Sequence, residues 1–587
     1  MRKFFKYLLA VVVGSLVSFF LLFIGLLLMV SVISSSASDE VKVKDNSILV
    51  LDINGPLSER GSDNPLDQVM SQLTGQPIPA GLNQILTAIK KAKKDDRIRG
   101  IYMESGLVMA GFATVEEIRN ELIDFKESGK FIYSFAPVYT QKAYYLASAA
   151  DKIYLTPTGM LDFQGLSSSR TFFKGTLDKL GIEMQVFKHG EFKSAVEPFI
   201  LEKMSAPARL QTETYLGSIW NNTLLNISKT RDLTVEQLNA VAEKLPAFMS
   251  DQDLLSSGLI DGLKYKDEVI DELKLLTGTK QKDDVNAVTA NKYHKVYISG
   301  EKKGLEKNKI AIIYAEGEID GSASGGIQSK DLSRTIREAR RDSSIKAIVL
   351  RINSPGGSGL GSEIIWREVL LAQKEKPVIA SMGDLAASGG YYIACAADSI
   401  VAQPNTLTGS IGVFGLIPNV KGAMTKIGVT TDVVKTNTFA DMPALDRPFT
   451  QDEKAIMQNY VERFYGVFLQ RCADGRKTTT KAIDEVGEGR VWSGENAIAL
   501  NLVDKLGGID DAINIAKNMA DLDSYRIVEL PEQLPFAEQL MKDLTENASM
   551  RIGKLLLGEE YQIAKKISEL KTAYPIQARI PYDISIQ

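Results

Sequence analysis

The chain has 587 residues, of which 44% are hydrophobic and 24% are charged, so it is too long for one ordinary domain and apolar enough for packed cores. Its 69 Lys and Arg against 73 Asp and Glu give a net charge of −4, which argues against a general nucleic-acid-binding protein. Two cysteines, Cys395 and Cys472, cannot form a disulfide framework or a thiolate metal cage, and two histidines nearly exclude a histidine-rich metal site. We therefore expect neither a metal ion nor a cofactor.

The N-terminal segment has the pattern of a membrane anchor. Residues 8–33 carry no charge, and these 26 residues would form a helix about 39 Å long, enough to cross a hydrocarbon core of about 30 Å. Arg2, Lys3 and Lys6 precede the stretch, so the positive-inside rule places the N-terminus in the cytoplasm and the rest of the chain on the other side. A cleaved signal peptide is the alternative, but its apolar core is normally only about 7–15 residues long. The sequence therefore favours an uncleaved, single-pass anchor.

The remainder of the chain contains two copies of one strand and helix pattern. Each copy starts with a short apolar strand, within residues 47–59 and 309–321, and continues through a helix, a buried strand, a third strand and another helix. Asp151 and Asp398 occupy equivalent places, 247 residues apart. Strands that are apolar throughout and alternate with helices predict parallel βαβ units with right-handed crossovers. The sequence therefore predicts two homologous α/β domains that arose by internal duplication.

We expect five segments along the chain. They are a tip, anchor and linker over residues 1–46, a first repeat over 47–290, a linker over 291–308, a second repeat over 309–524 and a tail over 525–587. The connection between the repeats is rich in polar residues and lacks apolar periodicity, which is typical of a linker.

The two repeats differ at one strand-to-helix turn. The second repeat has Ser388 followed by Gly389 and Gly390, whereas the first has Gln141 opposite the serine. A serine among small residues at such a turn is a candidate nucleophile, because the helix N-terminus stabilises negative charge and the glycines let a substrate backbone approach. The alternative is that Ser388 only caps the helix.

A second difference follows an earlier strand of the second repeat. Residues 353–357 read NSPGG, where the first repeat has the mostly apolar residues 106–110. A turn such as Gly356-Gly357 after a parallel strand offers backbone N–H groups to an oxyanion. An ordinary turn is the alternative, although the apolar sister copy indicates that the fold itself does not require these glycines.

The first repeat supplies a candidate general base. Lys193 has Ala440 as its counterpart, so the lysine is unique to one copy and Ser388 to the other. Most lysines are surface charges, which is the alternative here, but the apolar neighbours of Lys193 favour burial. Burial lowers the pKa of a lysine by disfavouring its charged form, which a general base requires. His189, four residues earlier, is the competing base, and we expect its presence to be incidental.

Three segments carry a family resemblance. They closely resemble signal peptide peptidase A of the long, duplicated protease IV type: LAASGGYYIACAADSIVAQPNTLTGSIGVFG at 385–415, INSPGG at 352–357 and GEFKSAVEPFILEKMS at 190–205. The resemblance extends over about residues 47–520 and the anchor. It implies two tandem Clp-protease/crotonase-like domains after one N-terminal transmembrane helix.

The resemblance also implies roles for individual residues. Ser388 would be the nucleophile, Lys193 the general base and Ser410 a second serine that orients the lysine, whereas the first repeat has Phe163 at the position of Ser410. Backbone N–H groups of Gly389 and of Gly356 or Gly357 would hold the oxyanion. The sequence leaves open whether this Ser/Lys dyad forms within one chain or between chains.

The function implied by the resemblance is that of a membrane-anchored serine endopeptidase that degrades cleaved signal peptides in or at the membrane. It would be a homotetramer in the bacterial inner membrane, with its catalytic domains on the periplasmic side. Two other classes remain open from the residues alone. A crotonase-like acyl-CoA enzyme predicts a carboxylate base and no anchor, and a non-catalytic membrane scaffold needs neither Ser388 nor Lys193. We expect Cys395 and Cys472 to be small buried residues rather than nucleophiles.

Overall fold

The computed structural model describes most of the chain between residues 41 and 532. The described residues are 41–62, 71, 78–298, 306–321, 326–532 and 576–579, with isolated positions between residues 4 and 20. The anchor predicted over residues 8–33 lies outside them, apart from those isolated positions. Within these ranges, no helix is both long and apolar enough to span a bilayer.

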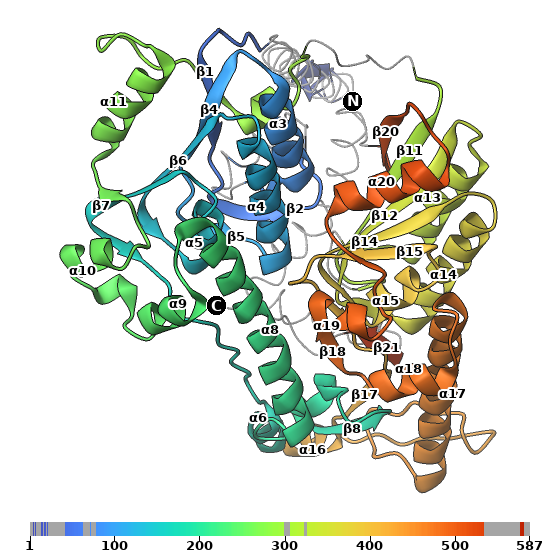
Figure 1. The fold of residues 1–587 in the computed structure, drawn as a ribbon. Helices are drawn as coiled ribbons and strands as arrows, with labels where there is room; N and C mark the ends of the chain where they lie inside the picture. The colour runs from blue at the N-terminus through green and yellow to red at the C-terminus, as the bar shows by residue number, and fades with distance from the viewer. Residues whose placement is uncertain are drawn as a thin grey trace.

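The N-terminal half is built on a six-stranded sheet in the order β10-β1-β4-β6-β7-β9, in which every neighbouring pair is parallel. Figure 1 labels β1, β4, β6 and β7 of this sheet. Its strands are β1 (Ser47–Leu51), β4 (Ile98–Met103), β6 (Phe131–Tyr139), β7 (Lys152–Leu161), β9 (Gly262–Leu263) and β10 (Ala287–Thr289). Helices α3 (Leu82–Lys94), α4 (Phe112–Lys126) and α5 (Gln141–Ala147) alternate with these strands. One face of α3 is apolar and buried, including Ile85 and Ile89, and three lysines lie in its last turn, where cations favour the helix dipole.

The C-terminal half is built on an eight-stranded sheet. Its main order is β18-β16-β14-β12-β11-β20, and β15 and β19 branch from β14. The strands are β11 (Lys309–Glu316), β12 (Ile345–Ser354), β14 (Val378–Ala387), β15 (Ser399–Ala402), β16 (Leu407–Gly409), β18 (Val491–Ser493), β19 (Lys505–Leu506) and β20 (Arg526–Leu530). Most residues of β11, β12 and β14 are buried, as in a parallel sheet covered on both faces. Strand β20, within the expected tail, pairs with β11 and so belongs to this sheet.

The other elements surround these two sheets. A small sheet contains β2 (Gly55–Ser58), β3 (Ala80–Gly81) and β5 (Val108–Met109). The N-terminal half also contains α6 (Lys174–Leu180), α7 (Glu197–Ile200), α8 (Ala206–Arg231), α9 (Val235–Ala242), α10 (Asp251–Ser256) and α11 (Lys266–Thr277), and α12 (Ala290–Tyr293) begins the expected linker. The C-terminal half contains α13 (Ser329–Arg341), α14 (Gly359–Gln373), α15 (Gly389–Ala394), α16 (Lys421–Lys426), α17 (Gln451–Gly475), α18 (Thr480–Val486), α19 (Gly494–Ala499) and α20 (Ile509–Met519).

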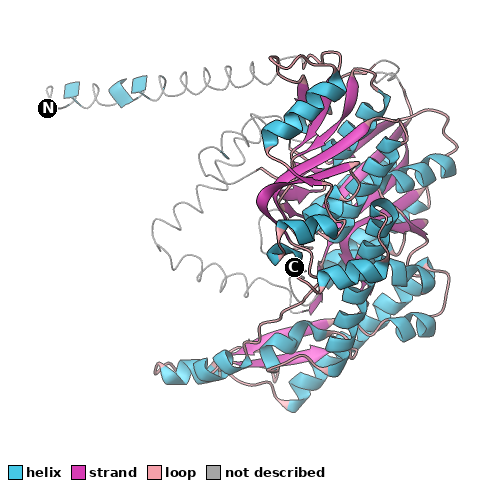
Figure 2. Ribbon diagram, turned by 60° about the vertical axis from the view of Figure 1, so that its left-hand side comes forward, coloured by secondary structure: helices cyan, strands magenta, loops and turns pink. Residues whose placement is uncertain are grey.

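A four-stranded antiparallel sheet joins the two halves. Its order is β13-β21-β17-β8, with β8 (Glu183–Lys188) from the N-terminal half and β13 (Gly356–Ser358), β17 (Phe414–Asn419) and β21 (Ile576–Arg579) from later in the chain. Figure 1 labels β8 and β17 at the lower end of the molecule, and Figure 2 shows the same strands there in magenta. Since β8 pairs with β17 along its whole length, the residues that follow β8 lie against the C-terminal half.

Candidate active site

Ser388 lies at the sharp turn between β14 and α15. Its backbone has φ 55° and ψ −114°, a conformation that residues other than glycine rarely adopt. The N–H of Ser388 donates to the carbonyl of Gly409 at 2.8 Å, and every residue of α15 is buried, so the surroundings hold the turn in this shape. A serine at a strained strand-to-helix turn is typical of the nucleophile position in α/β hydrolases.

Lys193 lies in the segment that follows β8 and is fully buried. Its aliphatic stem runs between two glycines of the C-terminal half. A Cβ placed on Gly489 would lie 2.7 Å from the Cβ of Lys193, and one placed on Gly412 would lie 3.3 Å from its Cδ. Side chains at these two positions would therefore compete with the lysine for space.

The structure brings Lys193, Ser388 and Ser410 together within a single chain. The Nζ of Lys193 lies 2.8 Å from the Oγ of Ser388, 3.1 Å from the Oγ of Ser410 and 3.2 Å from the carbonyl oxygen of Ser410. The hydroxyl of Ser410 donates onward to the carbonyl of Gly489 at 3.3 Å. These three side chains therefore meet without a contribution from a second chain.

Burial lowers the pKa of Lys193 well below the ordinary lysine value. A neutral amine has two N–H donors and one lone pair. Here the two N–H groups can donate to the hydroxyl and carbonyl of Ser410, which leaves the lone pair to accept the proton of Ser388. The three contacts suit the three N–H donors of an ammonium, and they equally suit a neutral amine that donates twice to Ser410 and accepts from Ser388.

The glycine turn after β12 lies against α15, because a Cβ on Gly390 would lie 2.8 Å from the carbonyl oxygen of Ser354. The N–H of Gly356 donates to the Oγ of Ser354 at 3.2 Å, so this N–H has a partner within the turn. On either side of Gly357, Gly356 accepts from the N–H of Ile319 and Ser358 donates to the Ile319 carbonyl, each at 2.8 Å. Because neighbouring residues of a strand point their polar groups in opposite directions, the N–H of Gly357 faces away from Ile319, toward β21.

In the first repeat, other side chains occupy the positions that correspond to Ser388 and Ser410. Phe163, the counterpart of Ser410, packs against Tyr144 and Trp220, with ring centroids 5.5 Å and 5.2 Å away. Gln141, the counterpart of Ser388, accepts from the backbone N–H groups of Gln164 and Gly165. These contacts fix side chains where the second repeat has its serine pair.

The remaining sequence candidates have other partners. The Nδ1 of His189 lies 2.5 Å from a carboxylate oxygen of Glu462, and its ring stacks on Tyr465 at 3.9 Å between centroids. Cys395 and Cys472 are buried free thiols. Over the part of the chain that the structure describes, no group of His, Cys, Asp and Glu side chains could hold a metal ion.

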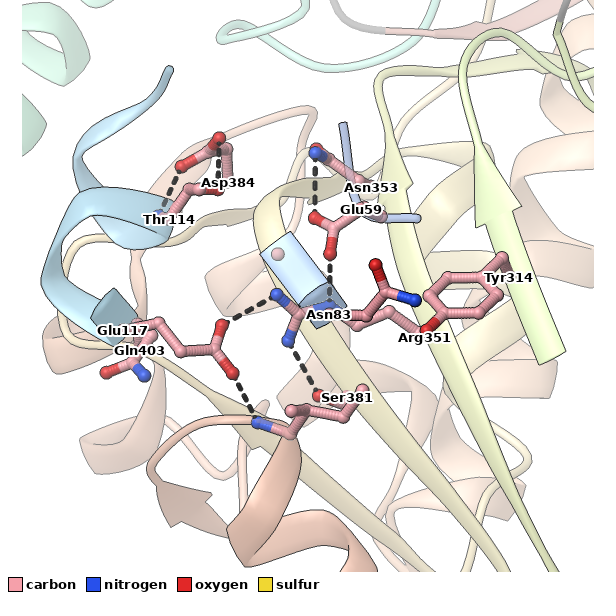
Figure 3. Close-up of polar contacts among 12 residues, drawn as sticks. Glu59, Asn83, Thr114, Glu117, Tyr314, Arg351, Asn353, Ser381, Asp384 and Gln403 are labelled. Atoms are coloured by element: carbon pink, nitrogen blue, oxygen red, sulfur yellow. Dashed lines mark hydrogen bonds and ion pairs between the residues drawn. The ribbon is translucent and has the colours of Figure 1, made fainter. Parts of the chain in front are cut away.

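Sequence reasoning did not single out a second buried polar group near the site, centred on Arg351, Glu59 and Glu117 (Figure 3). A signal for it was available, because Arg351 is the single charged residue of the otherwise apolar segment IVLRI, residues 348–352. A charge within a buried strand requires an opposite charge nearby. Its partners could not be identified from the pattern, since they lie more than 200 residues earlier.

Comparison with known proteins gives the family. The sequence-family model described as Peptidase family S49 matches the chain twice, over residues 124–280 and 371–523. One match contains Lys193 and the other contains Ser388. The chain is 35% identical to "Protease 4" of Salmonella typhi over 542 residues, which are 90% of this chain and 86% of that protein. It is 32% identical to "Protease 4" of Haemophilus influenzae over 94% of this chain and 95% of the relative.

A third relative comes from a plant. "Serine protease SPPA, chloroplastic" of Arabidopsis thaliana is 32% identical over 556 residues, which are 92% of this chain and 78% of that protein. The predictions of an α/β duplication and of a peptidase are thereby confirmed, in preference to an acyl-CoA enzyme or a scaffold. Since the family model matches each half once and the relatives span nearly the whole chain, the chain belongs to peptidase family S49, as a serine protease with two repeats.

Proposed function

We propose that this chain is a membrane-anchored serine endopeptidase that degrades cleaved signal peptides, with Ser388 as nucleophile and Lys193 as general base. The observation that supports these roles is the 2.8 Å contact between the Lys193 amine and the Ser388 hydroxyl, in a place where both side chains are buried. The substrate class follows from the resemblance to signal peptide peptidase A and from the apolar N-terminal segment, which would hold the site close to a bilayer.

The reaction starts from the neutral form of Lys193. Its lone pair takes the proton of Ser388 as the Oγ attacks the peptide carbonyl carbon, and the resulting ammonium protonates the leaving amine. Neutral Lys193 then removes a proton from water as the water oxygen attacks the acyl-enzyme, and it returns that proton to the departing Oγ of Ser388. Ser410 orients the lysine throughout, because its hydroxyl and carbonyl oxygens accept the two remaining N–H groups.

The oxyanion of the tetrahedral intermediate requires backbone donors. Gly389 supplies one N–H at the first position of α15, where the helix N-terminus favours negative charge. Of the two turn glycines, Gly357 is the better second donor, since the N–H of Gly356 already donates to Ser354. A large reduction in activity is expected whenever such a donor is displaced.

Peptide substrates would bind by adding a strand between β13 and β17. Strand β21 lies antiparallel to both in the structure, with Ala578 opposite Gly357 and Gln577 opposite Phe414. A substrate in the same place would form main-chain hydrogen bonds that do not depend on its sequence and would present a carbonyl beside Gly357. This mode of binding suits a class of peptides that share an apolar character but not a sequence.

The further parts of the proposal concern location and assembly. The charge pattern around residues 8–33 favours a single-pass anchor with its N-terminus in the cytoplasm and both repeats on the periplasmic side of a bacterial inner membrane. We also propose a homotetramer, and a Clp-protease/crotonase-like architecture for each half, as the resemblance implies. Cross-linking of the purified full chain in detergent checks the number of subunits.

Fluorophosphonate labelling tests the proposed nucleophile directly. The purified protein should be modified at Ser388, identified by mass spectrometry, and should hydrolyse short apolar peptides. Ser388→Ala should abolish both labelling and hydrolysis, and Lys193→Ala should slow both by at least about 10³-fold, because members of a dyad act as a unit. Retained hydrolysis in folded Ser388→Ala, or labelling at another serine, would contradict the assignment.

A further inference from the structure

Arg351 connects the two halves of the molecule from the middle of β12. Its side chain is fully buried, and its guanidinium lies between two carboxylates of the N-terminal half (Figure 3). The Nε donates to Glu59 at 2.7 Å, and one terminal nitrogen donates to Glu117 at 2.7 Å. The other terminal nitrogen donates to the hydroxyl of Ser381 on β14 at 2.9 Å. Strands β12 and β14 are thus both tied to this group.

The second carboxylate oxygen of Glu59 reaches the catalytic part of the C-terminal half. It accepts a hydrogen bond from the side-chain amide nitrogen of Asn353 at 3.0 Å. The amide oxygen of Asn353 in turn accepts from the backbone N–H of Leu385 at 3.2 Å. Glu59, Asn353 and Leu385 therefore form a continuous series of hydrogen bonds. Its direction is set by the ionised form of Glu59, which can only accept; burial raises the pKa of Glu59 to about 7, and the guanidinium of Arg351 opposes this rise and favours the ionised form.

The last two members of this series of hydrogen bonds adjoin the candidate active site. Asn353 opens the turn that leads to Gly357, and Leu385 lies three residues before Ser388. The carboxylate of Glu59 also packs against the backbone of β14, since a Cβ on Gly383 would lie 2.3 Å from its Oε1. One side chain of the first repeat therefore holds together the two strands that carry the serine and the glycine turn.

A neighbouring contact fixes the same strand to the same half. The carboxylate of Asp384 accepts from the backbone N–H groups of Gly111 and Thr114, at 3.0 Å and 2.8 Å, and from the Thr114 hydroxyl at 2.7 Å. It thereby caps the N-terminus of α4 from across the interface. Lys193 also comes from the first repeat, so the placement of this interface bears on the distance between the lysine and Ser388.

We propose that Glu59 is a positioning residue of the peptidase site, and that it acts through Asn353 to hold the glycine turn and the Ser388 turn at their working separation. This inference rests on the proposed roles of Ser388 and Gly357. Glu59 does not touch the reacting atoms in this role. It sets the geometry on which the attack of Ser388 and the capture of the oxyanion depend, where errors of about 1 Å can reduce a rate by about 10²-fold.

Three variants of the full chain test the direction of the hydrogen bonds. In E59Q the glutamine oxygen can still accept from Arg351, but its NH₂ group then faces the NH₂ of Asn353. If Asn353 flips to relieve this, its NH₂ faces the N–H of Leu385, so one pair of donors clashes in either orientation. In N353D two carboxylates face each other. The double variant E59Q/N353D restores a donor opposite an acceptor at each contact and keeps the wild-type net charge.

We expect kcat for a short apolar peptide to fall about tenfold or more in E59Q and in N353D, with KM within about twofold of wild type. In E59Q/N353D kcat should return to within a few-fold of wild type. The matched control is E529Q, because Glu529 also joins the two halves, through Arg60 and Asn83, without a contact to Asn353 or Leu385. Its kcat should remain within about twofold of wild type even if its melting temperature falls.

An unchanged kcat in folded E59Q would overturn the inference, as would a double variant no more active than E59Q. If E59Q is insoluble, the comparison passes to N353D, whose kcat must rise when E59Q is added. Wild-type labelling at Ser388 separates the two levels of the proposal. Without that labelling the proposed function fails, whereas normal wild-type labelling with an unchanged E59Q rate removes only the role of Glu59.

Discussion

The amine nitrogen of Lys193 and the hydroxyl oxygen of Ser388 lie 2.8 Å apart, although 195 residues separate them in the chain. The pairing of β8 with β17 produces this contact, because it carries the segment after β8 across to the C-terminal half. Each repeat thus contributes one member of the pair, and the two side chains meet within one chain.

The pH dependence of activity should follow Lys193. Burial lowers its pKa, and only the neutral form can accept a proton, so kcat/KM should rise with pH through the lowered pKa and then level off. Below that pKa the rate should fall about tenfold per pH unit, as expected for one required deprotonation. A profile for a soluble peptide amide between pH 5 and 10 measures this. His189→Ala is the control and should leave the acid limb in place, and loss of the limb in that variant would assign it to the histidine instead.

Removal of the Ser410 hydroxyl should weaken the base without removing it. In Ser410→Ala, Lys193 keeps the carbonyl of residue 410 as a partner but loses the hydroxyl at 3.1 Å. The amine can then rotate away from Ser388, so we expect kcat to fall about 10- to 100-fold with little change in KM. The kcat from steady-state kinetics and the rate of fluorophosphonate labelling should fall by similar factors. A rate equal to wild type would mean that Ser410 does not orient the lysine.

Gly357 should tolerate no side chain. Its φ is 152°, and a Cβ there would lie 2.2 Å from the carbonyl oxygen of Ile319, so Gly357→Ala must displace the turn. We expect a loss of kcat of about 10²-fold or more, as for other displaced oxyanion donors. Gly217→Ala in α8 is the matched control, because among the described residues no atom outside the neighbouring backbone of α8 lies within 4 Å of the added Cβ. It should keep full activity and stabilise the fold by about 0.5–1 kcal/mol, measured by thermal and urea unfolding.

Strand β21 should compete with peptide substrates, since it pairs with β13 and β17 at the position proposed for them. Deletion of residues 576–587 should therefore lower KM for short apolar peptides and speed labelling of Ser388, each by several-fold. A chain that ends after residue 579 retains β21 and serves as the control, with kinetics close to wild type. Equal KM values in the two truncated proteins would show that β21 does not limit access to the site.

Features that depend on local patterns could be predicted from the amino-acid sequence. The duplicated α/β order follows from apolar strands alternating with helices, and the candidate residues follow from the places where the two copies differ, such as Ser388 against Gln141 and Lys193 against Ala440. Local residue types were sufficient for these predictions, because secondary structure and turn geometry are largely short-range properties. The boundaries were less predictable, since β20 lies beyond the expected end of the second repeat and is held there by its pairing with β11.

Contacts between groups that are distant in the chain depend on how the elements pack. In the folded chain Lys193 contacts Ser388, and Arg351 lies between Glu59 and Glu117. The N–H of Gly356 donates to Ser354, whereas the N–H of Gly357 faces β21. No periodic pattern in the sequence predicts these contacts, because each depends on the register of strands and on the docking of one half against the other. The apolar neighbours of Lys193 predicted that its pKa would be lowered, but the complete burial that lowers it comes from the assembled surroundings.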